Sequence, residues 1–433
     1  MRIAIVGTGH VGLTYAVAFA LQGHQVAAAD IDPEAIETLQ AGKPTFFEPG
    51  LADALANAMA TGRLSFSTDI AAGVRSAEIV FLCVGTPSRK DGSIDLTYLR
   101  KAAATVGRAM PSADGYRVVV VKSTVVPGTA EEVVRPVLEK SSGKKAGLDF
   151  GLCVNPEFLR EGSALEDALK PDRIVIGSLD ERSRESLLLV YETVPCPRFL
   201  TDPRTAEMVK YATNAFLATK VSFANELANL CDAFGEIDVD KVVEGMGLDG
   251  RINKKFLKAG LGFGGSCFPK DVKALVAAGT KKGYVPKILT ATLAVNEMQP
   301  LRAVQLAQAA VGSLKGKRVA ILGLSFKGGS DDVRESRAVP LAKALLEKGA
   351  KVVGYDPLAG EAFLREVPKA QIAKDLKSAL AHADVCIVHN DWPQWGNLTA
   401  KDFAPMRRKV VIDGRRILER AALKGVELYV LGG

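Results

Sequence analysis

The stretch RIAIVGTGHVG, residues 2–12, decides the fold. Its first part is a β-branched run ending in glycine, typical of a buried parallel strand. The pattern Gly-x-Gly-x-x-Gly follows and opens a helix expected to reach about Gly23, before a second strand over residues 24–30. The first glycine permits a tight turn, the second lets the backbone approach a pyrophosphate, and the third lets helix and strand pack closely. Asp30 would accept hydrogen bonds from ribose hydroxyls and repel a 2′-phosphate, so this unit predicts a site for NAD rather than NADP. The alternative is a glycine turn without a ligand.

The rest of the chain divides into three parts. Residues 1–202 alternate strands and helices, with further strands expected over 79–84, 117–122, 150–154 and 173–176. Residues 203–311 lose the strand signal, and 206–234, free of Pro and Gly, predict one long helix that can bridge two domains and offer a dimer face. Residues 312–433 repeat the opening pattern, with strands expected over 318–323, 351–356, 384–389 and 409–413 and a helix over 335–348. The expected fold class is α/β, with two Rossmann-like doubly wound parallel-sheet domains joined by a central helical region.

Composition excludes several classes of protein. Of 433 residues, 48% are hydrophobic and 24% charged, as in globular enzymes. Lys plus Arg exceed Asp plus Glu by 56 − 49 = 7, without a basic block, so no nucleic-acid partner is expected. The apolar N-terminal stretch is interrupted by glycines and His10 and is too short to span a membrane. We expect an unprocessed cytoplasmic protein that needs neither a membrane nor a metal.

The second Rossmann-like unit has a different turn, GLSFKGG over residues 323–329. Lys327, near a helix N-terminus, suits a phosphate group, and Phe326 offers a flat face for a base. An ordinary strand–helix loop is the alternative. Two nucleotide sites of unlike character would place NAD in one half and a nucleotide-bearing substrate in the other.

One cysteine of the six stands out, in the segment GFGGSCFPKD over residues 262–271. The glycines leave the Cys267 thiol accessible, and Pro269 suits the first turn of a helix. A helix N-terminus and nearby Lys270 favour the thiolate, so Cys267 is a candidate nucleophile, and Asp271, on the same helical face, could steer a water. An incidental cysteine in a glycine loop is the alternative. The remaining cysteines are expected to be structural: Cys83, Cys153, Cys196, Cys231 and Cys386.

A nucleophilic thiol beside NAD implies a particular chemistry. Oxidising an alcohol to an aldehyde needs only a hydride acceptor and a base. Oxidation onward to an acid needs a tetrahedral species that can release hydride, which a thiohemiacetal provides; water then hydrolyses the resulting thioester. A single-step NAD dehydrogenase of the hydroxyacid type, with Cys267 structural, is the competing reading, and a non-catalytic NAD-binding protein is a third.

A series of ordered motifs runs almost from end to end. They are GTGHVG (7–12), FFEPGL (46–51), CVGTPS (83–88), VKSTVVPGT (121–129), NPEFLREGSA (155–164), AEMVKYATNAFLATK (206–220), GFGGSCFPKD (262–271), GLSFKGGSDDVRES (323–336) and IDGRRI (412–417). With these motifs the chain resembles the UDP-glucose/GDP-mannose dehydrogenase family. The resemblance implies four-electron oxidation of a nucleotide sugar at C6 with NAD and Cys267.

The resemblance also implies roles for individual residues. Catalytic roles fall to Cys267, Lys210, Asn214, Asp271, Thr124 and Glu157. NAD would contact Gly7, Gly9, His10, Val11, Gly12, Asp30, Thr86, Thr124, Glu161 and Arg334. The nucleotide sugar would contact Glu157, Phe158, Leu159, Lys210, Asn214, Arg251, Phe256, Lys258, Phe263, Gly264, Phe326 and Lys327. Arg251 resembles an arginine that reaches the neighbouring subunit's substrate, which implies a homodimer. Each of these polar residues has a plainer alternative as a solvated or ion-paired side chain.

Two details refine this resemblance. Relatives commonly carry a basic residue where this chain has Ala35, so the adenosine end of the NAD site departs from the family pattern. The glycine after Arg160-Glu161, the phenylalanine after Cys267 and IDGRRI favour UDP-glucose as the substrate, with conversion to UDP-glucuronate. GDP-mannose is the alternative.

Overall fold

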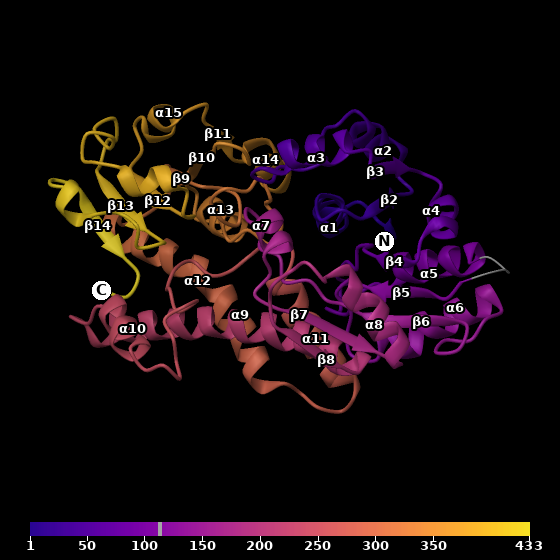
Figure 1. Ribbon diagram of the computed structural model, residues 1–433. Helices are drawn as coiled ribbons and strands as arrows, with labels where there is room; N and C mark the ends of the chain where they lie inside the picture. Colours follow the sequence, from indigo (N-terminus) through magenta and orange to yellow (C-terminus); the bar gives the residue numbers. More distant parts are fainter. Residues whose placement is uncertain (111–114) are drawn as a thin grey trace. The chain divides into compact units, whose positions relative to one another are not determined.

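The computed structural model describes residues 1–110 and 115–433, which form two compact units, Met1–Thr213 and Asn214–Gly433. Each unit contains one twisted sheet with helices beside it (Figure 1). Helix α9 (Pro203–Phe234), 32 residues long, begins in the first unit and ends in the second. The expected single long helix over 206–234 is therefore confirmed.

The first unit is built on an eight-stranded sheet in the order β3-β2-β1-β4-β5-β6-β7-β8. Neighbouring strands are parallel except β6 and β7, which pair antiparallel. The strands are β1 (Arg2–Val6), β2 (Gln25–Ala29), β3 (Leu64–Ser67), β4 (Ile79–Leu82), β5 (Arg117–Val121), β6 (Phe150–Val154), β7 (Ile174–Ser178) and β8 (Arg198–Thr201). The strand order reverses between β1 and β4, which is where open α/β sheets bind their ligands.

Helices cover this sheet by burying apolar faces. Leu13, Leu55 and Leu187, from three different helices, are all fully buried in one core with Ile3 and Ile5 of β1. Each such leucine contributes roughly 2 kcal/mol by leaving water. The helices are α1 (His10–Leu21), α2 (Pro33–Gln40), α3 (Leu51–Ala60), α4 (Ile70–Ser76), α5 (Thr97–Ala109), α6 (Arg135–Ser142), α7 (Ala164–Leu169) and α8 (Glu181–Val190), with a π-helical turn at Ala130–Val134.

The second unit begins with helices only. After α9 come α10 (Val239–Gly247), α11 (Phe268–Lys281) and α12 (Lys287–Val311). Ser222 of α9 donates a hydrogen bond to the Thr292 carbonyl of α12 (2.7 Å), so these two long helices are tied together by buried polar groups.

The rest of the second unit is a six-stranded, wholly parallel sheet in the order β11-β10-β9-β12-β13-β14. Its strands are β9 (Arg318–Leu322), β10 (Lys351–Tyr355), β11 (Gln371–Ile372), β12 (Val385–Val388), β13 (Val410–Asp413) and β14 (Glu427–Val430). The helices are α13 (Ala338–Glu347), α14 (Gly360–Glu366) and α15 (Leu376–Leu380), with short 3-10 helices at Pro393–Asn397 and Arg420–Ala422. The strand order matches β3-β2-β1-β4-β5-β6, so the expected pair of Rossmann-like sheets is confirmed.

One expected helix boundary is wrong. The helix expected over 335–348 begins instead at Ala338. Glu335 has a left-handed backbone (φ 51°), which no helix interior accommodates, and the Ser336 hydroxyl accepts the Ala338 N–H. The strands β3, β8, β11 and β14 were not expected, because they are the edge strands of the two sheets and lack the continuous apolar run of a buried parallel strand.

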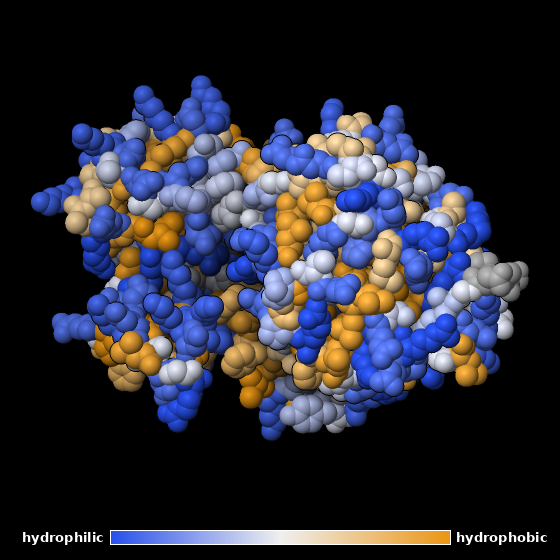
Figure 2. All heavy atoms as spheres, in the orientation of Figure 1, coloured by the Kyte–Doolittle hydropathy of each residue, from blue (hydrophilic) through white to orange (hydrophobic). Residues whose placement is uncertain are grey.

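The visible surface mixes charged and polar side chains with separate apolar patches (Figure 2). Several large apolar side chains of helix α9 are exposed: Phe216, Phe223, Leu230 and Phe234. Among the described residues, no helix combines the length and the hydropathy that crossing a membrane requires.

Candidate active site

The three glycines of the first turn have different surroundings. Gly7 has φ 98°, and a Cβ there would lie 2.9 Å from the Cys83 carbonyl oxygen. A Cβ on Gly12 would lie 1.8 Å from the Gly7 carbonyl oxygen, so helix α1 can approach β1 only without a side chain. Gly9 faces open space, with nothing within 4 Å of where its Cβ would be. The backbone of the turn is therefore exposed at Gly9 and buried at Gly7 and Gly12.

A cavity of about 640 Å³ opens beside this turn, at the carboxyl ends of β1, β2 and β4. Gly9 and Asp30 line it, and helix α5 closes one side. Asp30 accepts hydrogen bonds from the Thr8 N–H (2.7 Å) and Thr8 hydroxyl (3.2 Å), which fixes the carboxylate at the rim. A glycine-lined cavity at a helix N-terminus with a carboxylate at its edge fits the adenosine and pyrophosphate of NAD.

The other residues expected to bind NAD lie in different places. Within the first unit, His10 stacks on the ring of Phe46 (3.7 Å between centroids). The Thr86 hydroxyl donates to the Thr124 carbonyl (2.9 Å), so those two threonines lie together. Val11 and Glu161 are both half-buried. Arg334 belongs to the second unit, where its guanidinium forms a two-point ion pair with Asp332 (2.6 and 2.9 Å).

Glu157 and Lys210 form a buried ion pair across 53 residues of sequence (3.0 Å). Burial alone would raise the pKa of the Glu157 carboxyl, but the charge and hydrogen bond of Lys210 and the N–H of Leu159 (2.6 Å) outweigh it, and the pKa lies below its usual value. Glu157 is therefore ionised at neutral pH. The Phe158 ring lies beneath the Arg173 guanidinium (3.9 Å) and near Lys210, which fixes the start of the NPEFLREG segment.

Lys122, in the VKSTVVPGT motif, has a position that the sequence did not suggest. Its ammonium is almost completely buried, donates to the Asn155 side-chain oxygen (2.9 Å) and lies over the Tyr15 ring (3.7 Å). Burial lowers the pKa of Lys122 to about 7. Because Asn155 comes two residues before Glu157, Lys122 holds the strand end from which Glu157 projects.

Cys267 sits where its helix begins. It is the N-cap residue of α11, is half-buried, and its carbonyl accepts the Asp271 N–H (2.8 Å). Pro269 occupies the first turn as expected, and the Ser266 hydroxyl lies 3.5 Å from the Cys267 sulfur. Within the described residues, no group of three or more His, Cys, Asp or Glu side chains could hold a metal ion.

Asp271 is the centre of a buried polar cluster in the second unit. One of its oxygens accepts from the Asn214 amide (2.6 Å), and the other from the Lys270 ammonium (2.6 Å). Lys270, expected beside the thiol, thus forms an ion pair with Asp271. The cluster joins the turn after Cys267 to helix α9.

The expected substrate loop, residues 251–258, is mostly exposed. The Arg251 side chain is 90% exposed and forms a two-point ion pair with neighbouring Asp249 (2.6 and 3.1 Å). Phe256 has a left-handed backbone (φ 64°) and a ring that is 41% exposed, and Lys258 is exposed. This loop presents four cations, Arg251, Lys254, Lys255 and Lys258, and an aromatic ring to solvent.

The glycine loop before Cys267 packs tightly against the second Rossmann turn. A Cβ on Gly264 would lie 2.3 Å from the Glu335 carbonyl oxygen, and one on Gly265 would lie 2.8 Å from the Phe326 ring. Phe263 exchanges two hydrogen bonds between its backbone and the Asn296 amide (2.7 and 3.0 Å). The loop therefore brings together Phe263, Gly264 and Phe326, three of the residues expected to bind substrate. The ammonium of Lys327, which was also expected to bind substrate, lies 5.6 Å from the centre of the Phe326 ring.

Asp356 fills the second Rossmann turn from within. One of its oxygens accepts from Leu324 N–H (2.7 Å), Ser325 N–H (3.2 Å) and the Trp392 indole (3.1 Å). The other accepts the N–H groups of residues 358 and 359. Asn390 also enters the turn: a Cβ on Gly323 would lie 1.9 Å from its side-chain oxygen. Asp356 thus accepts two backbone N–H groups of this turn, whereas Asp30 accepts one from the first turn, that of Thr8.

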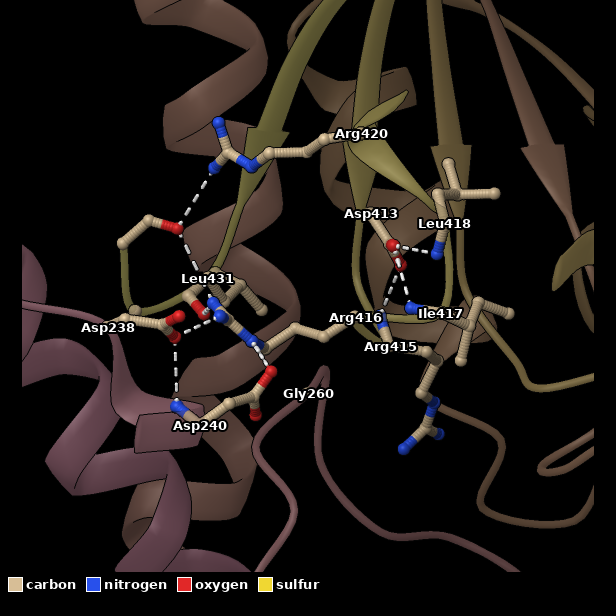
Figure 3. A network of polar contacts seen from close by, with 12 residues as sticks. Asp238, Asp240, Gly260, Asp413, Arg415, Arg416, Ile417, Leu418, Arg420 and Leu431 are labelled. Atoms are coloured by element: carbon tan, nitrogen blue, oxygen red, sulfur yellow. Dashed lines mark hydrogen bonds and ion pairs between the residues drawn. The ribbon is translucent and has the colours of Figure 1, made fainter. Parts of the chain in front are cut away.

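The IDGRRI motif sends two arginines in different directions (Figure 3). Asp413 accepts the Arg415, Ile417 and Leu418 N–H groups (2.7–3.0 Å), which shapes the turn. Arg416 reaches α10, where it pairs with Asp238 and with Asp240 (2.7 Å). Arg415 instead donates to the His389 carbonyl (2.8 Å) and lies beside Gly260. The motif thus joins the second sheet to the helical part of its own unit.

The other cysteines contrast with Cys267. Burial raises the pKa of the Cys83 thiol to about 12, and raises the pKa values of Cys153 and Cys386 strongly. Cys231 is buried in α9, and Cys196 is half-buried. Three of these thiols are therefore held protonated at neutral pH.

All three parts of the chain match domains of one family. Residues 1–195 match the NAD binding domain of the UDP-glucose/GDP-mannose dehydrogenase family, residues 204–298 its central domain, and residues 320–420 its UDP binding domain. The first match confirms the expectation of NAD as the cofactor.

Individual relatives align along almost the whole chain. A UDP-glucose 6-dehydrogenase of Haloferax volcanii is 46% identical over 97% of this chain and 98% of its own length. A GDP-mannose 6-dehydrogenase of Azotobacter vinelandii is 39% identical over 95% and 96%. The structure of a UDP-glucose dehydrogenase from Pyrobaculum islandicum superposes with a TM-score of 0.93 at 44% identity, covering 99% of this chain and 97% of that one. This likeness confirms the expected fold class.

Proposed function

The chain belongs to the UDP-glucose/GDP-mannose dehydrogenase family, and from that premise we propose that it oxidises UDP-glucose at C6 to UDP-glucuronate. The observation that carries the proposal is the position of Cys267, a half-buried thiol at the N-cap of α11. A helix N-terminus favours the thiolate, which is the nucleophilic form.

The thiol makes the second oxidation possible. The C6 alcohol first loses two electrons and two protons to give an aldehyde. The Cys267 sulfur then adds to the aldehyde carbon while a proton is taken up by the aldehyde oxygen, and the thiohemiacetal loses two more electrons and two protons to become a thioester. Water cleaves the C–S bond, releasing the carboxylate and regenerating the thiol. NAD, when bound, supplies the hydride acceptor for both oxidations.

Buried polar and charged groups would transfer the protons and stabilise the oxyanions of these steps. Lys210 and Asn214, one turn apart on α9, would stabilise the negative charge that develops on the C6 oxygen. Glu157, ionised beside Lys210, would assist proton transfer and hydrolysis. Asp271 and Thr124 would position the water. The support for these roles is the Glu157–Lys210 pair and the Asn214–Asp271 hydrogen bond.

We assign cofactor and substrate to different parts of the chain. Residues 1–202 would bind NAD, residues 203–311 would form the central helical and dimerisation part, and residues 312–433 would bind the UDP moiety. The NAD contacts proposed are Gly7, Gly9, His10, Val11, Gly12, Asp30, Thr86, Thr124, Glu161 and Arg334. The substrate contacts proposed are Glu157, Phe158, Leu159, Lys210, Asn214, Arg251, Phe256, Lys258, Phe263, Gly264, Phe326 and Lys327.

A homodimer follows from the exposure of two regions. Arg251 projects into solvent from its loop, and we assign it to the substrate of a partner subunit. Exposed phenylalanines along α9 offer an apolar face for that partner. We place the enzyme in the cytoplasm, where a reducing environment keeps the Cys267 thiol active.

Product analysis of purified protein tests the proposal. Wild type should form two NADH per UDP-glucose and release UDP-glucuronate. Cys267→Ser should retain NAD binding but lose acid formation by at least about a thousandfold, because a serine hydroxyl stays protonated near neutral pH and is a far poorer nucleophile than a thiolate. Cys196→Ser, at the other half-buried thiol, is the matched control and should keep full activity. One NADH per sugar, or acid formation by Cys267→Ser, would contradict the covalent route.

The identity of the sugar is tested in parallel. GDP-mannose is the second candidate, because a GDP-mannose 6-dehydrogenase aligns over nearly the whole chain. When the two nucleotide sugars are assayed at equal concentration, the enzyme should turn over UDP-glucose. Turnover with GDP-mannose alone would transfer the proposal to that substrate.

A further inference from the structure

Two buried asparagines of the second unit hold the segment that leads to Cys267. Asn225 of α9 and Asn296 of α12 are at most 1% exposed, so neither side chain reaches solvent. The Asn225 side-chain oxygen accepts the Gly260 N–H (2.7 Å). The Asn296 side-chain oxygen accepts the Phe263 N–H (2.7 Å), and its amide nitrogen donates to the Phe263 carbonyl (3.0 Å). The two amides thus supply hydrogen bonds that a helix or a strand would otherwise supply to this stretch of loop.

The two residues between these anchors fit the same arrangement. Leu261 is fully buried and belongs to one core with Ala303 of α12. Gly262 has φ 96°, and a Cβ there would lie 2.5 Å from the Asn296 side-chain oxygen. Only glycine can therefore bring the backbone this close to Asn296. The segment is held by α9 at its start, by the core in its middle and by α12 at its end.

Helices α9 and α12 are tied to each other on both sides of the two asparagines. Before them, Ser222 donates to the Thr292 carbonyl (2.7 Å). After them, the Arg302 guanidinium forms an ion pair with Asp232 (3.1 Å). Both ties join residues that are 70 positions apart, so the two helices run in the same direction here. The loop is therefore anchored to a pair of helices that are fixed to each other.

We propose that Asn225 and Asn296 are positioning residues, which set where the Cys267 sulfur and the backbone of Phe263 and Gly264 lie. This inference rests on the proposed function, in which the sulfur attacks the C6 aldehyde and the loop contacts the nucleotide sugar. The glycines on both sides of Phe263 leave the loop backbone free to rotate unless it is anchored. Each asparagine acts through that backbone, and a displacement of about 1 Å at a reacting group can cost about a hundredfold in rate.

Amide hydrogen exchange of the full-length protein tests the anchoring without any substrate. Asn296→Ala removes two hydrogen bonds to the loop, so residues 260–266 should exchange at least about tenfold faster than in wild type. Asn225→Ala frees another N–H of the loop and should act in the same direction. Ser222→Ala is the matched control, because it removes a buried hydrogen bond between the same two helices and none to the loop. In this control, the exchange of residues 260–266 should match wild type.

Steady-state kinetics measures the positioning role. Both asparagine variants should lower kcat/KM for UDP-glucose about ten- to a hundredfold, because the sulfur and the sugar contacts of the loop are displaced. The NADH dissociation constant should stay within about twofold of wild type, because the cavity beside the glycine turn lies in the first unit. Ser222→Ala should lower the urea midpoint but keep kcat/KM. An effect of stability alone would instead lower kcat/KM in all three variants.

The outcomes separate this inference from the proposed function. Unchanged exchange in both asparagine variants, or an equal loss of kcat/KM in Ser222→Ala, would overturn the inference even if the enzyme oxidises UDP-glucose. Faster exchange confined to the asparagine variants supports the anchoring even if wild type oxidises no nucleotide sugar, a result that would sink the proposed function alone. Circular dichroism of each variant shows that the fold is kept, and if Asn296→Ala does not fold, Asn225→Ala decides.

Discussion

The two Rossmann-like turns occur in sheets of the same strand order, but the first turn is open to a cavity and the second is filled by side chains. In the first unit the turn after β1 opens onto a cavity, and Gly9 leaves backbone exposed. In the second unit the turn after β9 is filled by Asp356 and Asn390, which occupy its backbone donors and its space. Strand topology thus provides a ligand crevice, and the side chains at the strand ends decide whether a dinucleotide can enter it.

Gly12→Ala should have the largest effect, because it destroys the open turn. The new Cβ would lie 1.8 Å from the Gly7 carbonyl oxygen, and rigid backbone offers no relief. We expect a loss of more than about 4 kcal/mol of unfolding free energy and no NADH binding. Chemical denaturation measures the first effect and fluorescence titration the second. Gly9→Ala is the control: it should fold normally, because its Cβ meets nothing within 4 Å, and a destabilisation equal to that of Gly12→Ala would contradict this account.

Asp356→Ala and Asp30→Ala should differ sharply in stability. Removing Asp356 leaves the buried N–H groups of residues 324, 325 and 359 and the part-buried N–H of residue 358 without their acceptor, at a cost of about 3–5 kcal/mol. Asp30 accepts fewer bonds at a half-buried rim, so its loss should cost only about 1 kcal/mol. Urea denaturation compares them. Equal losses would mean that the second turn is not held from within.

Acid should weaken the filled turn through His389, whose ring contacts the Gly323 carbonyl (3.1 Å). Burial, then the charge of Arg415, lowers the pKa of His389 to about 3. The unfolded chain takes up a proton below about pH 6.5, whereas the folded chain does so only near pH 3. The contribution of neutral His389 to the free energy of unfolding is therefore complete above pH 6.5 and is lost as the pH falls toward 3. The loss is on the order of 2 kcal/mol by pH 5. Denaturation at several pH values, with His389→Gln as the non-titrating control, measures it; an equal pH slope in that variant would refute the assignment.

The smallest expected effect concerns the choice of cofactor. Asp30→Ala removes the carboxylate that repels a 2′-phosphate, so the preference for NADH over NADPH should fall about tenfold. Fluorescence titration with both cofactors gives the ratio. The variant Asp32→Ala removes a neighbouring helix cap instead and should leave the ratio unchanged. An unchanged ratio in Asp30→Ala would remove this residue from cofactor selection.

Local sequence patterns predicted much of this molecule, because they reflect local geometry. The glycine spacing at residues 7–12 and Pro269 after Cys267 each specify a turn or a helix start within a few residues. The resemblance implied separate roles for Glu157 and Lys210, but their ion pair was not predicted, since the two residues are 53 positions apart. The filling of the second turn was also not visible, because Asp356 follows its strand as Asp30 does, and the side chain of Asn390 comes beside Gly323 only in the folded chain. Likewise, several residues of helix α5 share one helical side in the sequence, but only the folded chain places them at a cavity.

The chain contains two tryptophans, Trp392 and Trp395, and both follow β12 and contact the side chains that fill the second turn. Trp392 donates to Asp356 (3.1 Å) and Trp395 to Asn390 (3.1 Å). Intrinsic indole emission therefore reports on the second unit alone, whereas NADH bound to the first unit emits at a longer wavelength. One sample, excited at two wavelengths, can show which half of the molecule melts first.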